Sequence, residues 1–132
     1  MRKNKKIWND VLPQRELVFE KFDAKAKYKD ELYKAGAMSD GERVCLYLIA
    51  QCLITPDNYI IVIDEPEIHL HTSIMKRLWD DIERYSPNKT FVYITHDLKF
   101  ASSRKAATKI WVQSYDGNGN WQISNIDDND DI

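Results

Sequence analysis

The chain has 132 residues, of which 43% are hydrophobic and 30% charged, and a net charge of −2. This length suffices for one domain with a core, and nothing in the nearly balanced net charge indicates nucleic acid or a membrane surface as a partner. No apolar run approaches the roughly 20 residues of a membrane helix, and the basic start MRKNKKIWND lacks the apolar stretch of a signal peptide. We therefore expect a cytoplasmic protein without a membrane segment.

The first third of the chain predicts a short helix and a small sheet. Residues 5–12 form the helix, which ends before Pro13 because a residue that precedes proline is pushed out of helical space. Over residues 16–33, short alternations of apolar and polar residues predict an antiparallel meander, with breaks at Asp23 and at 29–30.

A polar turn, MSDGER, then stands directly before an apolar run. Ser39 and Glu42 have the S-x-x-E spacing of a capping box, which starts a helix. The helix over about 41–53 is apolar nearly all round, which predicts burial on most sides. Cys45 and Cys52 share a face but lie roughly 10 Å apart at about 1.5 Å per residue, beyond the roughly 7 Å limit for a disulfide. We expect buried, reduced thiols.

The middle of the chain predicts a parallel sheet. Residues 59–63 and 90–95 are continuous apolar runs, typical of central parallel strands that are covered on both faces. Residues 71–85 between them have apolar positions at helical spacing, so this helix covers one face. A strand, a helix and a strand in this order predict a right-handed crossover and an α/β fold.

The last part of the chain predicts a short helix and a hairpin. The helix covers about 98–104, and the strands 109–115 and 121–126 flank DGNGN, a strong hairpin signal. The acidic residues 127–132 predict a tail or linker.

Ionisable residues follow both parallel strands, at the sheet edge where such folds bind ligands. Asp64 and Glu65 end the first strand, and His96 follows the second. One carboxylate of such a pair holds Mg²⁺ while the next accepts a proton from the attacking water, and a nearby histidine positions that water. Taken singly, such carboxylates more often belong to a solvated loop, and a lone histidine is more often a structural residue.

Three motifs in register resemble those of ABC-type ATPases. Ser39-Asp40-Gly41-Glu42-Arg43 resembles the signature motif, the run that ends in Asp64-Glu65 resembles Walker B, and His96 resembles the switch histidine, in the order found in that superfamily. The N–H groups and positive dipole of a helix start bind phosphate. This explains a serine and a glycine at the start of a buried helix.

The segment after the carboxylates narrows the resemblance. EPEIHLH (65–71) and MSDGER are similar to the AAA-labelled, ABC-like ATPases related to the RecF and overcoming-lysogenization-defect proteins. In the superfamily this segment is the D-loop, which crosses the dimer interface. The resemblance therefore implies that His69 and His71 are interface residues.

The resemblance implies a partial P-loop NTPase domain over residues 1–126 that binds ATP and Mg²⁺ in a head-to-tail homodimer. Ser39, Gly41 and Glu42 would contact nucleotide held by the opposite protomer. Asp64 would hold Mg²⁺, Glu65 would be the general base, and His96 would orient the water. Relatives couple hydrolysis to DNA repair or to defence against phage, so DNA is a possible partner of the full-length protein.

The sequence departs from the family at the phosphate-binding loop, G-x-x-x-x-G-K-[ST]. The chain has four glycines and none begins that pattern: Gly36, Gly41, Gly117 and Gly119. We therefore expect this chain to be the carboxyl-terminal half of an ATPase domain, with the missing amino-terminal half as its partner.

Two other functions fit the same residues. One is a metal-dependent nuclease or phosphoesterase, since imidazole and carboxylate side chains suit zinc or manganese; its candidate ligands are Asp64, Glu67, His69, His71 and His96. The other is a non-catalytic remnant that acts as a dimerisation module.

Overall fold

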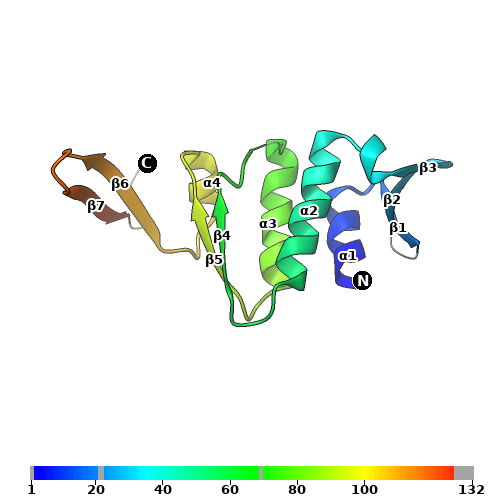
Figure 1. Ribbon diagram of the computed structural model, residues 1–132, viewed down its shortest axis with the longest axis horizontal. Helices are drawn as coiled ribbons and strands as arrows, with labels where there is room; N and C mark the ends of the chain where they lie inside the picture. The colour runs from blue at the N-terminus through cyan, green and yellow to red at the C-terminus, as the bar shows by residue number, and fades with distance from the viewer. Residues whose placement is uncertain (1, 21–22, 69, 127–132) are drawn as a thin grey trace. The chain divides into compact units, whose positions relative to one another are not determined.

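The computed structural model describes residues 2–20, 23–68 and 70–126, in two compact units, Met1–Ile94 and Thr95–Ile132 (Figure 1). The elements in chain order are α1 (Arg2–Val11), β1 (Glu16–Glu20), β2 (Asp23–Tyr28), β3 (Glu31–Lys34), the 3₁₀ helix η1 (Ala35–Ala37), α2 (Asp40–Ile54), β4 (Ile60–Asp64), α3 (Thr72–Arg84), β5 (Thr90–Ile94), α4 (Leu98–Ser103), β6 (Lys109–Tyr115) and β7 (Trp121–Ile126). Within this part of the chain, no helix has the length and apolarity to span a bilayer.

Three helices form the core of the first unit. α1 packs on α2 and on α3, and α2 also packs on α3. Each helix contributes a stripe of buried apolar side chains: Ile7, Trp8 and Val11; Cys45, Ile49 and Cys52; Met75, Leu78, Trp79 and Ile82. In Figure 1, α3 lies between the strands β4 and β5 and the helix α2.

The parallel pair expected in the middle of the chain is present. β4 and β5 pair in parallel from Ile60↔Thr90 to Asp64↔Ile94, and α3 connects them. The α/β fold with a parallel sheet and flanking helices is therefore confirmed. The ring of Tyr93 meets the buried Trp79 edge to face at 5.2 Å, so α3 covers this face of the sheet.

The other face of this sheet is open, and the expectation of cover on both faces is wrong for this structure. The alternate residues Ile60, Val62, Val92 and Ile94 are 65%, 61%, 42% and 55% exposed. Successive side chains of a strand point to opposite faces, so these four share one face, and Asp64 lies on it too. An unbroken apolar run makes both faces equally suited to burial but does not supply the element that covers the second.

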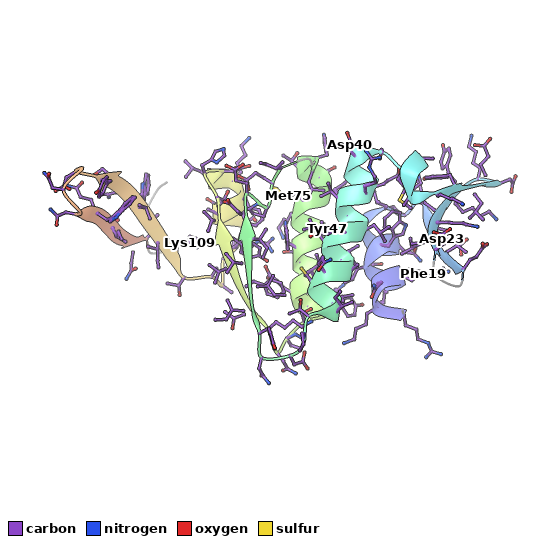
Figure 2. The ribbon with its side chains drawn as sticks, in the orientation of Figure 1. Phe19, Asp23, Asp40, Tyr47, Met75 and Lys109 are labelled. Atoms are coloured by element: carbon purple, nitrogen blue, oxygen red, sulfur yellow. The ribbon has the colours of Figure 1, made fainter. Side chains whose placement is uncertain are left out.

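Burial of α2 is also narrower than its apolar sequence predicts. Cys45, Ile49 and Cys52 form the buried stripe, whereas Tyr47, labelled in Figure 2, is 63% exposed and Ile54 is 70% exposed. The expected free, buried thiols are confirmed. Burial raises the pKa of Cys45 to about 12 and that of Cys52 to about 11, so both stay protonated at neutral pH.

The two antiparallel sheets agree with the sequence. β1, β2 and β3 form the meander of the first unit. In the second unit β6 pairs with β7, with a bulge between Val112 and Ser114. The side chain of Asp116 closes the turn by accepting from the N–H groups of Asn118 and Asn120, at 2.7 and 3.1 Å. The first helix begins at Arg2, three residues earlier than the pattern suggests.

Candidate functional site

The start of α2 is a capping box, as the sequence predicts. Ser39 Oγ accepts from the N–H of Glu42 at 3.3 Å, and a carboxylate oxygen of Glu42 accepts from the N–H of Ser39 at 2.8 Å. The N–H groups of Asp40 and Gly41 have no acceptor within the helix, because the first turn of any helix lacks one. Figure 2 labels Asp40 at this end of α2. The helix therefore presents donors and the positive end of its dipole here.

Glu42 is a buried carboxylate rather than an exposed one, with 8% of its surface accessible. One oxygen accepts from Arg15 Nε and from Tyr33 Oη, both at 2.8 Å, and the other accepts from Ser39. Burial raises the pKa of Glu42, but the hydrogen bonds from Ser39, Tyr33 and Arg15 outweigh burial and hold this pKa below its ordinary value. Both oxygens are thus bonded within the chain, so Glu42 fixes the positions of Ser39, Tyr33 and Arg15 around it.

The carboxylates after β4 stand on an unusual piece of backbone. Asp64 is exposed at the end of the strand, and Glu65 has a φ of 51°, in the left-handed region that non-glycine residues rarely adopt. The N–H of Glu65 donates to the carbonyl of Ile94 at 2.7 Å, and its own carbonyl accepts from Ile68 at 3.1 Å. Strained conformations persist where the surrounding structure enforces them, and they cluster at functional sites.

Trp79 stabilises this turn, a role that the sequence pattern did not predict. Its ring is fully buried, and its indole N–H donates to the carbonyl of Pro66 at 3.2 Å. Pro66 is itself buried and restricts the residue before it. The amphipathic pattern of α3 identifies a buried position at 79, but a bond across 13 residues to a carbonyl leaves no signal in that pattern.

The residues expected at a dimer interface follow this turn. His71 is exposed and caps α3, since its Nδ1 accepts from the N–H of Ser73 at 3.3 Å. His69 lies outside the described residues.

His96 belongs to the second unit, in a segment with a well-defined local structure. Asp97 caps α4 by accepting from the N–H groups of Lys99 and Phe100, at 2.8 and 3.2 Å, and its own N–H donates to Thr95 Oγ1 at 2.9 Å. His96 is exposed just before this cap. The first unit therefore holds two of the predicted segments, Asp64-Glu65 after β4 and Ser39 to Glu42 at the start of α2, whereas His96 lies in the second unit.

The candidate metal site has limited support in the structure. Among the described residues, which leave out His69, no three His, Cys, Asp or Glu side chains form a group that could hold a metal ion. The rival reading of a metal-dependent nuclease thus gains no ligand cluster from this part of the chain.

Comparisons with known proteins point to ATPase heads. Over 65 residues, 49% of this chain, the sequence is 40% identical to the ABC transporter A family member 4 of Dictyostelium discoideum, of which the match covers 4%. The fold matches a chain from work on the ATP-driven dimerization and DNA-stimulated activation of SMC ATPases, with a TM-score of 0.73, 22% identity, and cover of 96% of this chain and 83% of that one.

Two further solved structures share the fold. An SmcHead bound to the C-winged helix domain of ScpA matches with a TM-score of 0.74 and 21% identity, over 96% of this chain and 41% of that one. The SMC head domain from Thermotoga maritima matches with a TM-score of 0.68 and 18% identity, over 96% and 46%. The chain thus spans less than half the length of these two heads, and the likeness shows the fold.

The family comparison covers most of the chain. Residues 4–102 match the AAA_21 family, described as "AAA domain, putative AbiEii toxin, Type IV TA system". This range includes the capped start of α2, the Asp64-Glu65 turn and His96. The chain has the fold of SMC ATPase heads and belongs to the AAA_21 family of AAA domains.

Proposed function

We propose that this chain provides the signature and catalytic segments of an ABC-type ATPase head that binds Mg²⁺ and ATP in a head-to-tail dimer. The observation that carries the proposal is the left-handed turn at Glu65, directly after Asp64 at the end of β4, held by Ile94 and by Trp79 through Pro66. Lys29 and Asn58 also have a positive φ in turns of this chain, and the turn at Glu65 differs from them in its place directly after a parallel strand, beside Asp64.

Asp64 fits the magnesium site of this proposal. Its carboxylate is exposed at the carboxyl end of a parallel strand, and Mg²⁺ prefers one or two carboxylates together with phosphate oxygens and waters. When bound, the ion neutralises charge on the transferring phosphoryl group. Glu65 accepts a proton from the attacking water, and His96 orients that water.

The start of α2 fits a contact to phosphate of the opposite protomer. Ser39 and Gly41 offer a hydroxyl and a backbone N–H at the positive end of a helix of 15 residues. In Figure 1, α2 begins and β4 ends at the same end of the unit, with α3 between them. In the arrangement we propose, Ser39 and Asp64 of one chain serve different sites, and a head-to-tail pair brings one of each together.

The open face of β4 and β5 supports a partner segment that carries the phosphate-binding loop. This face holds Ile60, Val62, Val92 and Ile94, and Asp64 lies at its end. A contiguous apolar surface of this kind marks an interaction site. We assign it to the amino-terminal half of the ATPase domain. A segment placed there brings its loop beside the Asp64 carboxylate.

The cellular role we propose is that of a motor for an attached effector in DNA repair or phage defence. The description of the matched family names the AbiEii toxin and a type IV toxin–antitoxin system, and one structural relative comes from work on DNA-stimulated activation of SMC ATPases. Because the solved relatives are under 25% identical, this role rests on family resemblance. We place the protein in the cytoplasm. The tail or linker expected at residues 127–132 lies outside the described residues.

Glu65→Gln in the natural full-length protein tests the proposal. The amide cannot accept the proton, so ATP turnover falls by about 100-fold or more, while ATP-dependent dimerisation persists because the amide keeps the side chain's shape. Turnover by phosphate release and mass by light scattering measure the two effects. Glu31→Gln, an exposed glutamate on β3, is the matched control and should leave both unchanged.

Unchanged turnover in the Glu65→Gln protein would refute the assigned role. A wild-type protein that dimerises without binding or hydrolysing ATP would favour the non-catalytic module instead, a reading that the absent phosphate loop keeps open.

A further inference from the structure

A part-buried ionic cluster joins the meander to the start of α2, and neither the motifs nor the proposed catalysis accounts for it. Its centre is Glu42, which accepts from Arg15 Nε and Tyr33 Oη at 2.8 Å each. Arg15 lies in the turn before β1 and Tyr33 on β3, so both ends of the meander reach one carboxylate. We call Arg15, Tyr33 and Glu42 the anchor cluster.

Arg15 is fixed in place from two sides. Its carbonyl accepts from the indole N–H of the fully buried Trp8 at 2.9 Å, and its N–H donates to the carbonyl of Leu12 at 2.9 Å. Its guanidinium lies over the ring of Tyr28, 3.9 Å from the centroid. A side chain held this way loses little entropy when it pairs with a carboxylate, so the geometry is preorganised.

Glu42 in turn orients the hydroxyl of Ser39 through hydrogen bonds. Ser39 Oγ accepts from the N–H of Glu42 at 3.3 Å and lies 3.0 Å from Glu42 Oε2, to which its hydroxyl donates. A phosphate that arrives at this helix start competes with Glu42 Oε2 for that hydroxyl. A bare carboxylate so close would also repel the phosphate, and the guanidinium of Arg15 offsets that charge.

We propose that Arg15 and Tyr33 are positioning residues of the signature segment: they hold and neutralise Glu42 so that Ser39 can turn its hydroxyl to a phosphate of nucleotide bound by the opposite protomer. This inference rests on the proposed function. It makes Glu42 a support of the phosphate contact, and it couples the meander to nucleotide binding. An anchor cluster that serves only the fold would stabilise the chain without any effect specific to ATP.

The test compares ATP kinetics of three variants in the natural full-length protein. Arg15→Met leaves Glu42 charged without its cation, so the KM for ATP and the ATP concentration for half-maximal dimerisation rise on the order of tenfold, with kcat within about twofold. Arg15→Met with Glu42→Gln removes that charge and returns both to within about threefold of wild type. Lys5→Met, which breaks the exposed pair with Glu16, is the control and changes neither.

The outcomes separate this inference from the proposed function. Thermal unfolding of each variant verifies that it is folded, and Arg15→Lys, which keeps the charge, replaces the methionine variant if that protein does not fold; its KM stays within about threefold. The same KM in Arg15→Met as in Lys5→Met, or no recovery in a folded double variant, overturns the inference. Wild-type protein without ATP-dependent dimerisation overturns the proposed function itself, and that result is obtained before any variant is made.

Discussion

Two buried carboxylates of the first unit have opposite electrostatic surroundings. Glu42, bonded by four donors, has its pKa lowered, whereas burial raises the pKa of Asp81, an effect that Arg84 reduces and the nearby Asp10 and Asp80 strengthen. Asp81 is 5% exposed, and its Oδ2 accepts no hydrogen bond among the described residues. The charged form of Asp81 is therefore disfavoured in the folded protein.

Asp81→Asn should stabilise the protein at neutral pH. A raised pKa in the folded state means that ionised Asp81 destabilises the fold above that pKa, and that the penalty fades as the pH falls toward it. We expect the free energy of unfolding to rise by about 1 kcal/mol at about pH 7, and the gain to shrink at about pH 5. Urea unfolding at both values measures it. A variant less stable than wild type at neutral pH would mean that the bond from Arg84 outweighs burial.

The anchor cluster also marks the limit of prediction at single residues. The S-x-x-E spacing predicted the bonds between Ser39 and Glu42, because a capping box is a local arrangement. The bond from Arg15 spans 27 residues and depends on where the meander docks. Nothing in the neighbourhood of Arg15 in the sequence signals that contact.

The positions of the helices and strands follow from local sequence patterns, whereas the burial of their faces does not. The hairpin 109–115 and 121–126 has the predicted bounds, because a turn rich in glycine and asparagine fixes its own position. The strands β4 and β5 have the predicted place and pairing, yet one face is open. An apolar run shows that a strand is suited to burial. It does not show which element covers each face of the strand.

Val62→Lys on the open face of β4 tests whether a partner covers this sheet. If a partner segment covers this face in the full-length protein, the lysine buries an unpaired charge, so the free energy of unfolding should fall by about 3 kcal/mol. Leu32→Lys on β3 is the control, because Leu32 is 45% exposed and lies outside the proposed contact surface. This substitution should change the free energy of unfolding by less than about 0.5 kcal/mol. Chemical unfolding gives both values. Equal, small effects would mean that the face is open in the natural protein.

The arrangement of the first unit places the two segments of the proposed composite site on different elements. Three stacked helices and a parallel pair put the proposed signature segment at the start of α2 and the proposed catalytic turn after β4, with α3 between them. The motifs and their order predicted the family correctly over residues 4–102. The separation of the two segments came from packing and could not be obtained from the motifs.

Mixing two inactive full-length proteins tests the central claim, a composite site shared by two heads, most directly. Ser39→Arg blocks the phosphate contact and Glu65→Gln removes the base, so each protein alone should show almost no ATP turnover. In an equal mixture half of the dimers are mixed, and each has one intact site of two, so turnover should recover to about a quarter of the wild-type value. A mixture as inactive as its components would contradict a site that takes Ser39 from one protomer and Glu65 from the other.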